Sequence, residues 1–201
     1  EDTSLPIGHG QTISKPSVVA RMIELLFDGG SAREAGHLGR TLEVGTGCGY
    51  QTALLAQLAR RVVSIERLRP LFDKAQANLA AWRLDHVRLV FGDGMLGHPP
   101  NAPYDSLIAA AGGDELPASW LDQLAVGGRL VAPMHRRGGR GQVLVVVDRR
   151  ESRLVRTEPD EHELVHAEPV QPAHAAPALT PLSELNLPWD GEDDIDQLDQ
   201  V

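Results

Sequence analysis

Leu42-Glu43-Val44-Gly45-Thr46-Gly47-Cys48-Gly49-Tyr50 is the stretch that decides how the rest of this chain folds. Its first residues suit a short buried strand, and the leucines that follow it predict a helix. The alternating glycines between them permit a sharp turn and let a ligand come close to the backbone, because glycine has no Cβ. Such a turn after the first strand of a parallel sheet is where doubly wound folds bind nucleotide-like cofactors.

The spacing of the glycines indicates which cofactor to expect. The dinucleotide fingerprint needs Gly-x-Gly-x-x-Gly or Ala, whereas here Tyr50 occupies the place of the third glycine. A nicotinamide dehydrogenase is therefore disfavoured, and the spacing resembles the first motif of S-adenosylmethionine-dependent methyltransferases. The alternative is a tight strand-to-helix turn that binds nothing. From this stretch, the residues expected in the cofactor site are Glu43, Gly45, Thr46, Gly47 and Gly49.

Composition limits the function classes. The 201 residues suit one domain, and the net charge of −9 argues against a general nucleic-acid binder. The single cysteine, Cys48, excludes an internal disulfide framework and fits a reducing, cytoplasmic compartment; we interpret it as a small turn residue rather than a nucleophile. No apolar run reaches the length of a membrane span. Because the chain opens without Met, in what looks like mid-domain, we expect an N-terminal segment to be missing.

Strand and helix patterns alternate along most of the chain. Strands are predicted at 40–45, 62–65, 87–91, 104–110 and 129–134, with helices at 50–59, from Pro70 to Trp82, and through Leu121 and Leu124. This alternation predicts a doubly wound α/β fold with a mainly parallel sheet. Two further strands, 142–147 and about 154–170, have no helix between them. They predict an antiparallel addition at one edge, giving seven strands.

The ends of the chain differ from this pattern. Residues 1–15 are expected to form a loop, followed by a helix from Pro16 that is capped by Ser14 or Lys15, and then a linker at 31–39. Residues 182–201 hold seven acidic residues and no basic one. We therefore expect a domain at 1–170 and a disordered tail at 171–201.

Two acidic residues follow the next two strands. Glu66 ends the second strand, where a carboxylate can accept hydrogen bonds from both hydroxyls of a ribose, and Arg67 follows it in the sequence. Asp93 with Gly94 follows the third strand and suits an adenine amine. The alternatives are an ordinary strand-end acid and an Asp-Gly turn. The glycine turn, Glu66 and Asp93 all fall at the carboxyl ends of successive strands. We therefore favour one cofactor site that includes Glu66, Arg67, Asp93 and Gly94.

The most distinctive segment is Gly8-His9-Gly10-Gln11-Thr12-Ile13-Ser14, directly before Pro16. Together with the glycine turn and Gly92-Asp93-Gly94, it closely resembles the protein-L-isoaspartate O-methyltransferase family. Further similar pieces are Tyr50-Gln51-Thr52 and residues 64–67, 102–105 and 123–131. The resemblance runs from Glu1 to about Val170, and bacterial members carry a helical segment before the 8–14 loop.

The resemblance implies an activity and its residues. The family binds S-adenosylmethionine and methylates the α-carboxylate of isoaspartyl residues in damaged proteins, leaving S-adenosylhomocysteine; the ester collapses to a succinimide that reopens partly to aspartate. Ser14 then corresponds to the family's active-site serine, and Gln11, Thr12 and Ile13 line the cofactor and substrate. His9 is either a substrate contact or a loop-packing residue. We expect no metal, a monomer, and no nucleic-acid or membrane partner.

The chemistry suits Ser14. A carboxylate is already ionised near neutral pH, so methyl transfer needs orientation and exclusion of water rather than a strong base. A hydroxyl can donate to one carboxylate oxygen and leave the other to attack. The alternative role for Ser14 is a helix cap, and the two roles are compatible.

One segment departs from the family pattern. The family motif Val-Arg-Phe-Val-Pro-Leu is matched best by Val165-His166-Ala167-Glu168-Pro169-Val170, which places His166 at a substrate-binding position. This change motivates a first alternative, and the change together with the expected missing N-terminal segment motivates a second. One is a methyltransferase of the same fold for another peptide carboxylate, and the other is a non-catalytic cofactor-binding module that acts through the acidic tail.

Overall fold

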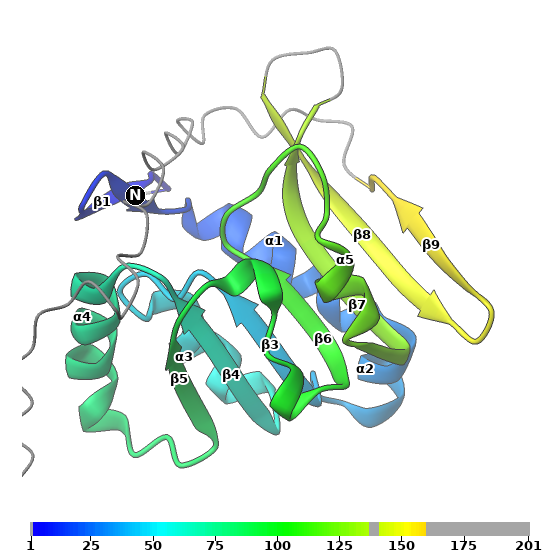
Figure 1. The fold of residues 1–201 in the computed structure, drawn as a ribbon, viewed down its shortest axis with the longest axis horizontal. Coiled ribbons are helices and arrows are strands. Elements are labelled where there is room, and N and C mark those ends of the chain that lie inside the picture. The colour runs from blue at the N-terminus through cyan, green and yellow to red at the C-terminus, as the bar shows by residue number, and fades with distance from the viewer. Residues whose placement is uncertain (1, 137–140, 160–201) are drawn as a thin grey trace, which may run out of the picture. The chain divides into compact units, whose positions relative to one another are not determined.

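The computed structural model describes residues 2–136 and 141–159, and Figure 1 shows their arrangement. Within these residues the main sheet has seven strands in the order β5-β4-β3-β6-β7-β8-β9. Their bounds are β3 (Arg40–Val44), β4 (Arg61–Glu66), β5 (Val87–Phe91), β6 (Tyr104–Ala109), β7 (Leu124–His135), β8 (Gln142–Arg150) and β9 (Arg153–Thr157). The first five strands in this order pair in parallel, and β8 and β9 are antiparallel. The predicted fold class is confirmed.

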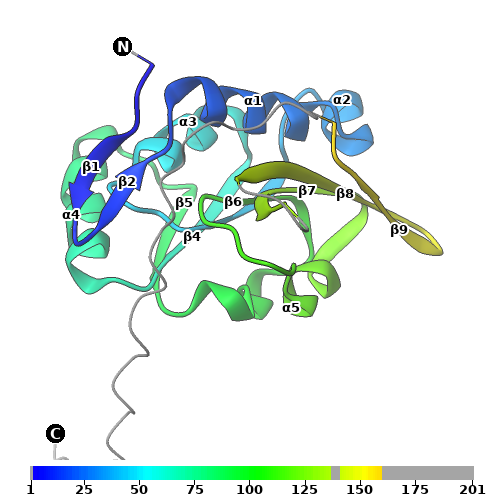
Figure 2. The same ribbon diagram turned by 90° about the horizontal axis from the view of Figure 1, so that it is seen from above.

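Helices cover both faces of the sheet. They are α1 (Pro16–Phe27), α2 (Gly30–Ala35), α3 (Tyr50–Leu58), α4 (Arg69–Leu79) and α5 (Ala118–Asp122), with short 3₁₀ turns η1 (Ala80–Trp82), η2 (Gly94–Leu96) and η3 (Pro99–Asn101). Figure 2 shows α1, α2 and α3 on one face and α5 on the other. On β6, Leu107 packs into the α5-side core and Ile108 into the opposite core. This double burial explains the continuous apolar run of β6.

The N-terminal segment is not the loop that the sequence suggests. Its strands β1 (Leu5–Gly8) and β2 (Gln11–Ile13) form an antiparallel hairpin, whose turn holds Gly8, His9 and Gly10 at φ values of 98°, 56° and 69°. Strands this short, separated by glycines, carry too little alternation to be recognised. The helix from Pro16 is confirmed. Its N-cap is Lys15, with no side-chain cap hydrogen bond.

The cap is supplied instead by a residue from before the hairpin. Asp2 accepts hydrogen bonds from the Ser17 backbone N–H (2.9 Å) and hydroxyl (2.7 Å) in the first turn of α1. These bonds hold the pKa of Asp2 below its usual value. The carboxylate therefore satisfies a free N–H of the helix and ties the start of the chain to α1.

Three other predictions need correction. The expected linker at 31–39 contains most of α2, which is followed by the C-cap Gly36 in the left-handed conformation. The helix predicted through Leu124 ends at Asp122, and Leu124 begins β7, so Gly127 and Gly128 form an irregularity within that strand rather than a connection before it. β9 ends at Thr157. The predicted continuation beyond 159 and the tail at 171–201 lie outside the described residues.

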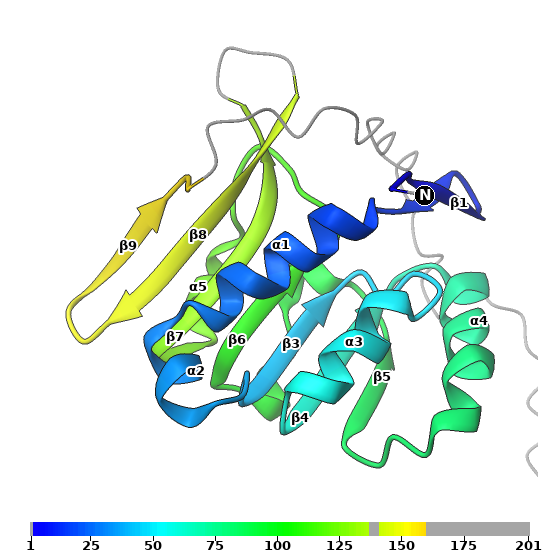
Figure 3. The same cartoon turned by 180° about the vertical axis from the view of Figure 1, so that it is seen from behind.

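The hairpin lies at the carboxyl ends of the parallel strands, as Figure 3 shows from behind. The Lys74 ammonium of α4 donates a hydrogen bond to the Ile7 carbonyl at 3.2 Å. The Ile7 side chain approaches Gly47 so closely that a Cβ there would lie 3.1 Å from its Cδ1. The hairpin therefore covers the glycine turn.

Candidate cofactor and active site

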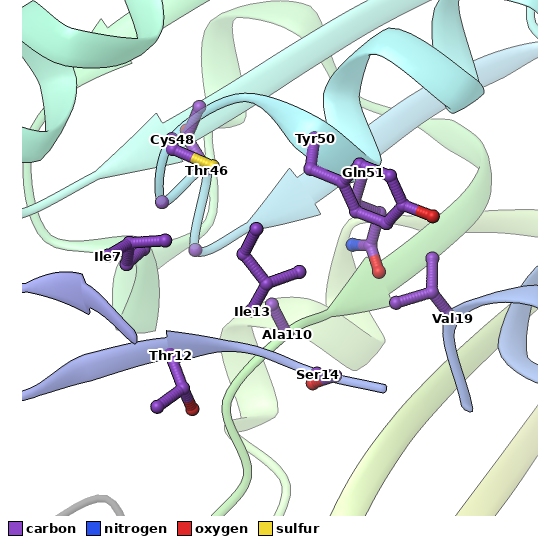
Figure 4. Close-up of a pocket in the computed structure, with 12 residues that line it drawn as sticks. Ile7, Thr12, Ile13, Ser14, Val19, Thr46, Cys48, Tyr50, Gln51 and Ala110 are labelled. Atoms are coloured by element: carbon purple, nitrogen blue, oxygen red, sulfur yellow. The ribbon is translucent and has the colours of Figure 1, made fainter. Parts of the chain in front are cut away.

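A pocket lies between the hairpin and the glycine turn (Figure 4). The residues that line it are Ile7, Thr12, Ile13, Ser14, Val19, Gly45, Thr46, Gly47, Cys48, Tyr50, Gln51 and Ala110. They come from the hairpin and the residue that follows it, α1, the glycine turn, the start of α3 and the residue that follows β6. Segments that are far apart in sequence thus meet at the carboxyl edge of the sheet, where doubly wound folds bind ligands.

The glycine turn has the backbone shape that its sequence suggests. Gly45, Gly47 and Gly49 all have positive φ, at 93°, 58° and 91°, which disfavours any side chain there. The N–H groups of Gly45 and Thr46 donate to the Ile65 carbonyl of β4 at 2.9 and 3.2 Å. The turn is therefore anchored to the neighbouring strand while its outer surface faces the pocket.

Glu66 braces the same turn. Its carboxylate accepts from the N–H of Gly47 (2.8 Å) with one oxygen and from the N–H of Leu68 (2.9 Å) with the other. Each carboxylate oxygen can accept a second hydrogen bond, so the group can still take a ribose diol. Arg67, next in sequence, is exposed and does not line the pocket.

The turn at Asp93 and Gly94 is held by α5. The Asp93 carboxylate accepts from the Met95 N–H at 2.9 Å and is otherwise exposed. The Trp120 indole N–H donates to the Gly94 carbonyl at 2.8 Å. A Cβ on Gly94 would lie 2.5 Å from Cγ1 of Val44, so only glycine lets this turn pack against β3. The sheet order places the Asp93 turn beyond Glu66, two strands from the pocket.

The hairpin residues divide into two groups. Thr12, Ile13 and Ser14 line the pocket, and the Ser14 hydroxyl has no hydrogen-bond partner within residues 2–136 and 141–159. Gln11 and His9 do not line it, and His9 lies exposed at the tip of the hairpin. His166 falls outside the described residues.

Two glycine-turn predictions concern buried residues. Gly49 is the N-cap of α3, and a Cβ there would lie 3.1 Å from the Leu79 side chain, so it packs against α4 rather than lining the pocket. Glu43 is fully buried in the centre of the sheet and does not line the pocket either. Burial raises the pKa of Glu43 to about 7 despite hydrogen bonds that oppose the shift.

Several pocket residues were not predicted from the sequence. Tyr50 and Gln51 directly follow the third glycine, so their position beside a cofactor turn was the available signal. Ile7, Val19 and Ala110 reach the pocket only through tertiary folding. In the part of the chain that the structure describes, no group of three or more His, Cys, Asp or Glu side chains is placed to hold a metal ion.

Comparison with known proteins assigns the family. The sequence model of "Protein-L-isoaspartate(D-aspartate) O-methyltransferase" matches residues 1–166. The chain is 62% identical over 172 residues to a protein-L-isoaspartate O-methyltransferase of Methylibium petroleiphilum, covering 85% of this chain and 62% of the relative. It is 65% identical over 151 residues to one of Leptothrix cholodnii, covering 74% and 52%. The chain thus spans between about half and two thirds of the length of these relatives.

Solved structures agree with this assignment. A protein-L-isoaspartate O-methyltransferase superposes with a TM-score of 0.68 at 30% identity, over 79% of this chain and 50% of the other. A putative Plasmodium falciparum enzyme, solved with S-adenosyl-L-homocysteine, gives a TM-score of 0.66 at 22% identity over 79% and 76%, which supports the fold alone. No helix among the described residues is long and apolar enough to cross a membrane. With its family match spanning the hairpin, the glycine turn and the sheet, the chain belongs to the protein-L-isoaspartate(D-aspartate) O-methyltransferase family.

Proposed function

We propose that this protein transfers a methyl group from S-adenosylmethionine to the α-carboxylate of L-isoaspartyl residues in damaged proteins or peptides. The observation that carries the proposal is the pocket itself, because Ser14 and the glycine turn line one cavity. The names of its relatives support the same reaction. The partners are then isoaspartyl proteins, and the expectations of a monomer in the cytoplasm belong to this proposal.

The residues present fit the cofactor. The glycine turn has no side chains at three positions of positive φ, and Glu66 and Asp93 follow the next two strands with acceptor capacity to spare. In this proposal Glu66 accepts the ribose hydroxyls, Asp93 with Gly94 takes the adenine, and Arg67 borders the site. When bound, the cofactor supplies an electrophilic methyl group on a sulfonium.

The protein's own task is to orient the substrate. The isoaspartyl carboxylate is ionised at neutral pH, so no base has to remove a proton. The Ser14 hydroxyl donates to one carboxylate oxygen and turns the other toward the reacting methyl. Thr12 and Ile13, which line the pocket, close the site against water, and Gln11 precedes them on the same strand. In this proposal His9 and His166 contact the substrate peptide.

The direct test is methyl transfer from labelled S-adenosylmethionine to a short isoaspartyl peptide, with its normal aspartyl twin as the control. We expect transfer to the isoaspartyl peptide alone. Transfer to neither peptide, with S-adenosylhomocysteine still bound in calorimetry, would remove the substrate assignment and favour the non-catalytic binding module.

A second candidate rests on the segment 165–170. His166 replaces the family's arginine, and Ala167 replaces an aromatic residue, so the peptide contacts differ from the family pattern. A methyltransferase of this fold for a different peptide carboxylate would explain the change. Adding glutamyl peptides to the same assay separates the two, because only this candidate expects transfer to a peptide other than the isoaspartyl one.

A further inference from the structure

A polar cluster lies buried beneath the glycine turn. At its centre the Glu43 carboxylate of β3 accepts from the Gln51 amide N–H (3.0 Å), the Thr52 hydroxyl (2.5 Å) and the Ser64 hydroxyl (2.6 Å). The Ser64 hydroxyl also lies 2.6 Å from that of Thr46. All five side chains belong to residues that are less than 9% exposed. The cluster therefore joins β3, β4, α3 and the glycine turn.

Such a cluster is costly to keep. Removing a carboxylate from water disfavours its charged form, and the nearby Glu66 charge acts in the same direction. A buried polar group is tolerated when its hydrogen bonds are complete, and Glu43 has three donors. Replacing such a cluster by apolar side chains is often neutral or stabilising, so its presence calls for a role beyond packing.

Only two members of the cluster, Thr46 and Gln51, also line the pocket. The Gln51 amide has two chemically different ends, and its nitrogen is engaged by Glu43. Its oxygen has no hydrogen-bond partner within residues 2–136 and 141–159. Figure 4 shows the amide of Gln51 extending from α3 toward the side of the pocket where Val19 and Ser14 lie. The carboxylate therefore determines which end of the amide the pocket receives.

The order of the strands indicates what that oxygen meets. The groups assigned to adenine and ribose follow β5 and β4, whereas Gln51 follows β3. An elongated cofactor laid across this edge brings its amino-acid end to the β3 and β6 side, beside Gln51. The donor of that end is an ammonium group, and a carbonyl oxygen that faces a cation is a favourable acceptor.

We propose that Glu43 is a positioning residue that acts through Gln51, fixing its amide so that the carbonyl oxygen accepts a hydrogen bond from the cofactor's ammonium group. The inference rests on the proposed function, since it assumes S-adenosylmethionine as the cofactor. It assigns Glu43 an indirect part in cofactor binding, and Gln51 a direct one.

The test compares two ligands by calorimetry. S-adenosylhomocysteine carries the amino-acid end, and 5′-methylthioadenosine lacks it. Glu43→Leu removes the carboxylate that accepts from the Gln51 amide. We therefore expect the affinity for S-adenosylhomocysteine to fall roughly tenfold or more, while the affinity for 5′-methylthioadenosine changes less than about twofold. Gln51→Met, at the start of α3, should give the same selective loss of affinity for S-adenosylhomocysteine. It replaces Glu43→Leu as the test if that variant does not fold.

Two controls make the comparison specific. Glu43→Gln keeps an amide oxygen for Gln51, and the hydroxyls of Ser64 and Thr52 can turn to accept from its NH₂, so it should retain the preference for S-adenosylhomocysteine. Thr52→Val removes another donor to Glu43 but lines no part of the pocket, so it should leave the ratio of the two affinities unchanged.

The outcomes separate this inference from the proposed function. If the unaltered protein binds neither ligand, the proposed function fails. If it binds both, and Glu43→Leu and Gln51→Met weaken both equally or not at all, the positioning role is overturned while the proposed cofactor stands.

Discussion

Ser14 brings to the pocket a hydroxyl that no described residue engages by hydrogen bonding. Since Lys15 is the N-cap of α1 and Asp2 accepts from Ser17, the capping role weighed for Ser14 is carried elsewhere. The hydroxyl is therefore available for a ligand. The sequence motif had marked this residue, but only the structure shows that its helix does not use it.

Ser14→Ala should lower kcat for the isoaspartyl peptide by roughly 10²-fold, because the carboxylate loses the donor that orients it. Calorimetry should give an S-adenosylhomocysteine affinity within about twofold of the unaltered protein. Ser17→Ala, which removes a hydroxyl outside the pocket, is the matched control. An unchanged kcat for Ser14→Ala would contradict the assigned role.

The loop that follows β6 is clamped to the end of β7. The His135 N–H donates to the Gly113 carbonyl at 3.1 Å, and the His135 ring lies 2.9 Å from the Asp114 carboxylate. A Cβ on Gly112 would overlap the Pro133 carbonyl oxygen. Since Ala110, at the start of this loop, lines the pocket, the clamp also fixes one wall of the site.

Gly112→Ala should destabilise the protein by about 1–3 kcal/mol, because a backbone carbonyl cannot move aside as a side chain can. Gly113→Ala is the matched control, since the nearest atom to its added Cβ is the Glu115 carbonyl oxygen at 4.0 Å. Urea unfolding of both variants measures the difference. Equal stabilities would show that the loop adjusts and that the close contact has no energetic weight.

At the scale of the described fold, a few polar contacts join the sheet to its helices and fix neighbouring elements to one another, which non-directional apolar packing alone does not do. The Arg129 guanidinium of β7 pairs with Asp148 of β8 at 2.6 and 2.8 Å and also donates to the Leu25 carbonyl of α1 at 2.9 Å. Glu43 similarly connects the centre of the sheet to α3. Because Glu43 is buried, its ionisation affects the stability of the entire fold.

The pKa of Glu43 is about 7 in the folded protein, against an ordinary value of 4.5. The folded state therefore binds this proton more tightly, so the associated stability is fully present below the ordinary value and is lost as pH rises through about 7. The free energy of unfolding falls by roughly 3 kcal/mol over this pH range. Glu43→Gln does not titrate, so its stability relative to the unaltered protein should rise from about pH 5 to about pH 8.

Urea unfolding across this pH range measures the effect. Glu158→Gln, which removes an exposed carboxylate, is the control and should run parallel to the unaltered protein. A Glu43→Gln curve that also runs parallel would mean that Glu43 titrates alike in the folded and unfolded chains.

Much of the architecture follows from local pattern. The strand at 87–91 was predicted at both bounds, and the parallel strands β6 and β7 were recognised from the apolar runs that burial on both faces of a sheet requires. The helix from Pro16 follows from the fixed φ of proline and one apolar face. The hairpin and α2 were not predicted, because segments of three to six residues contain too few helical turns or strand alternations to show a periodic pattern of apolar residues.

The sequence by itself determined the order of the main strands and longer helices and the types of residue at the ends of the strands, because burial and backbone geometry act on neighbouring residues. It did not determine which of those residues meet. Ile7, Ser14 and Ala110 line one pocket, while Glu43 lies buried beneath it and Asp93 two strands away. That selection depends on strand order and on which side of each strand a residue faces, and both are decided only when the two cores pack against the sheet.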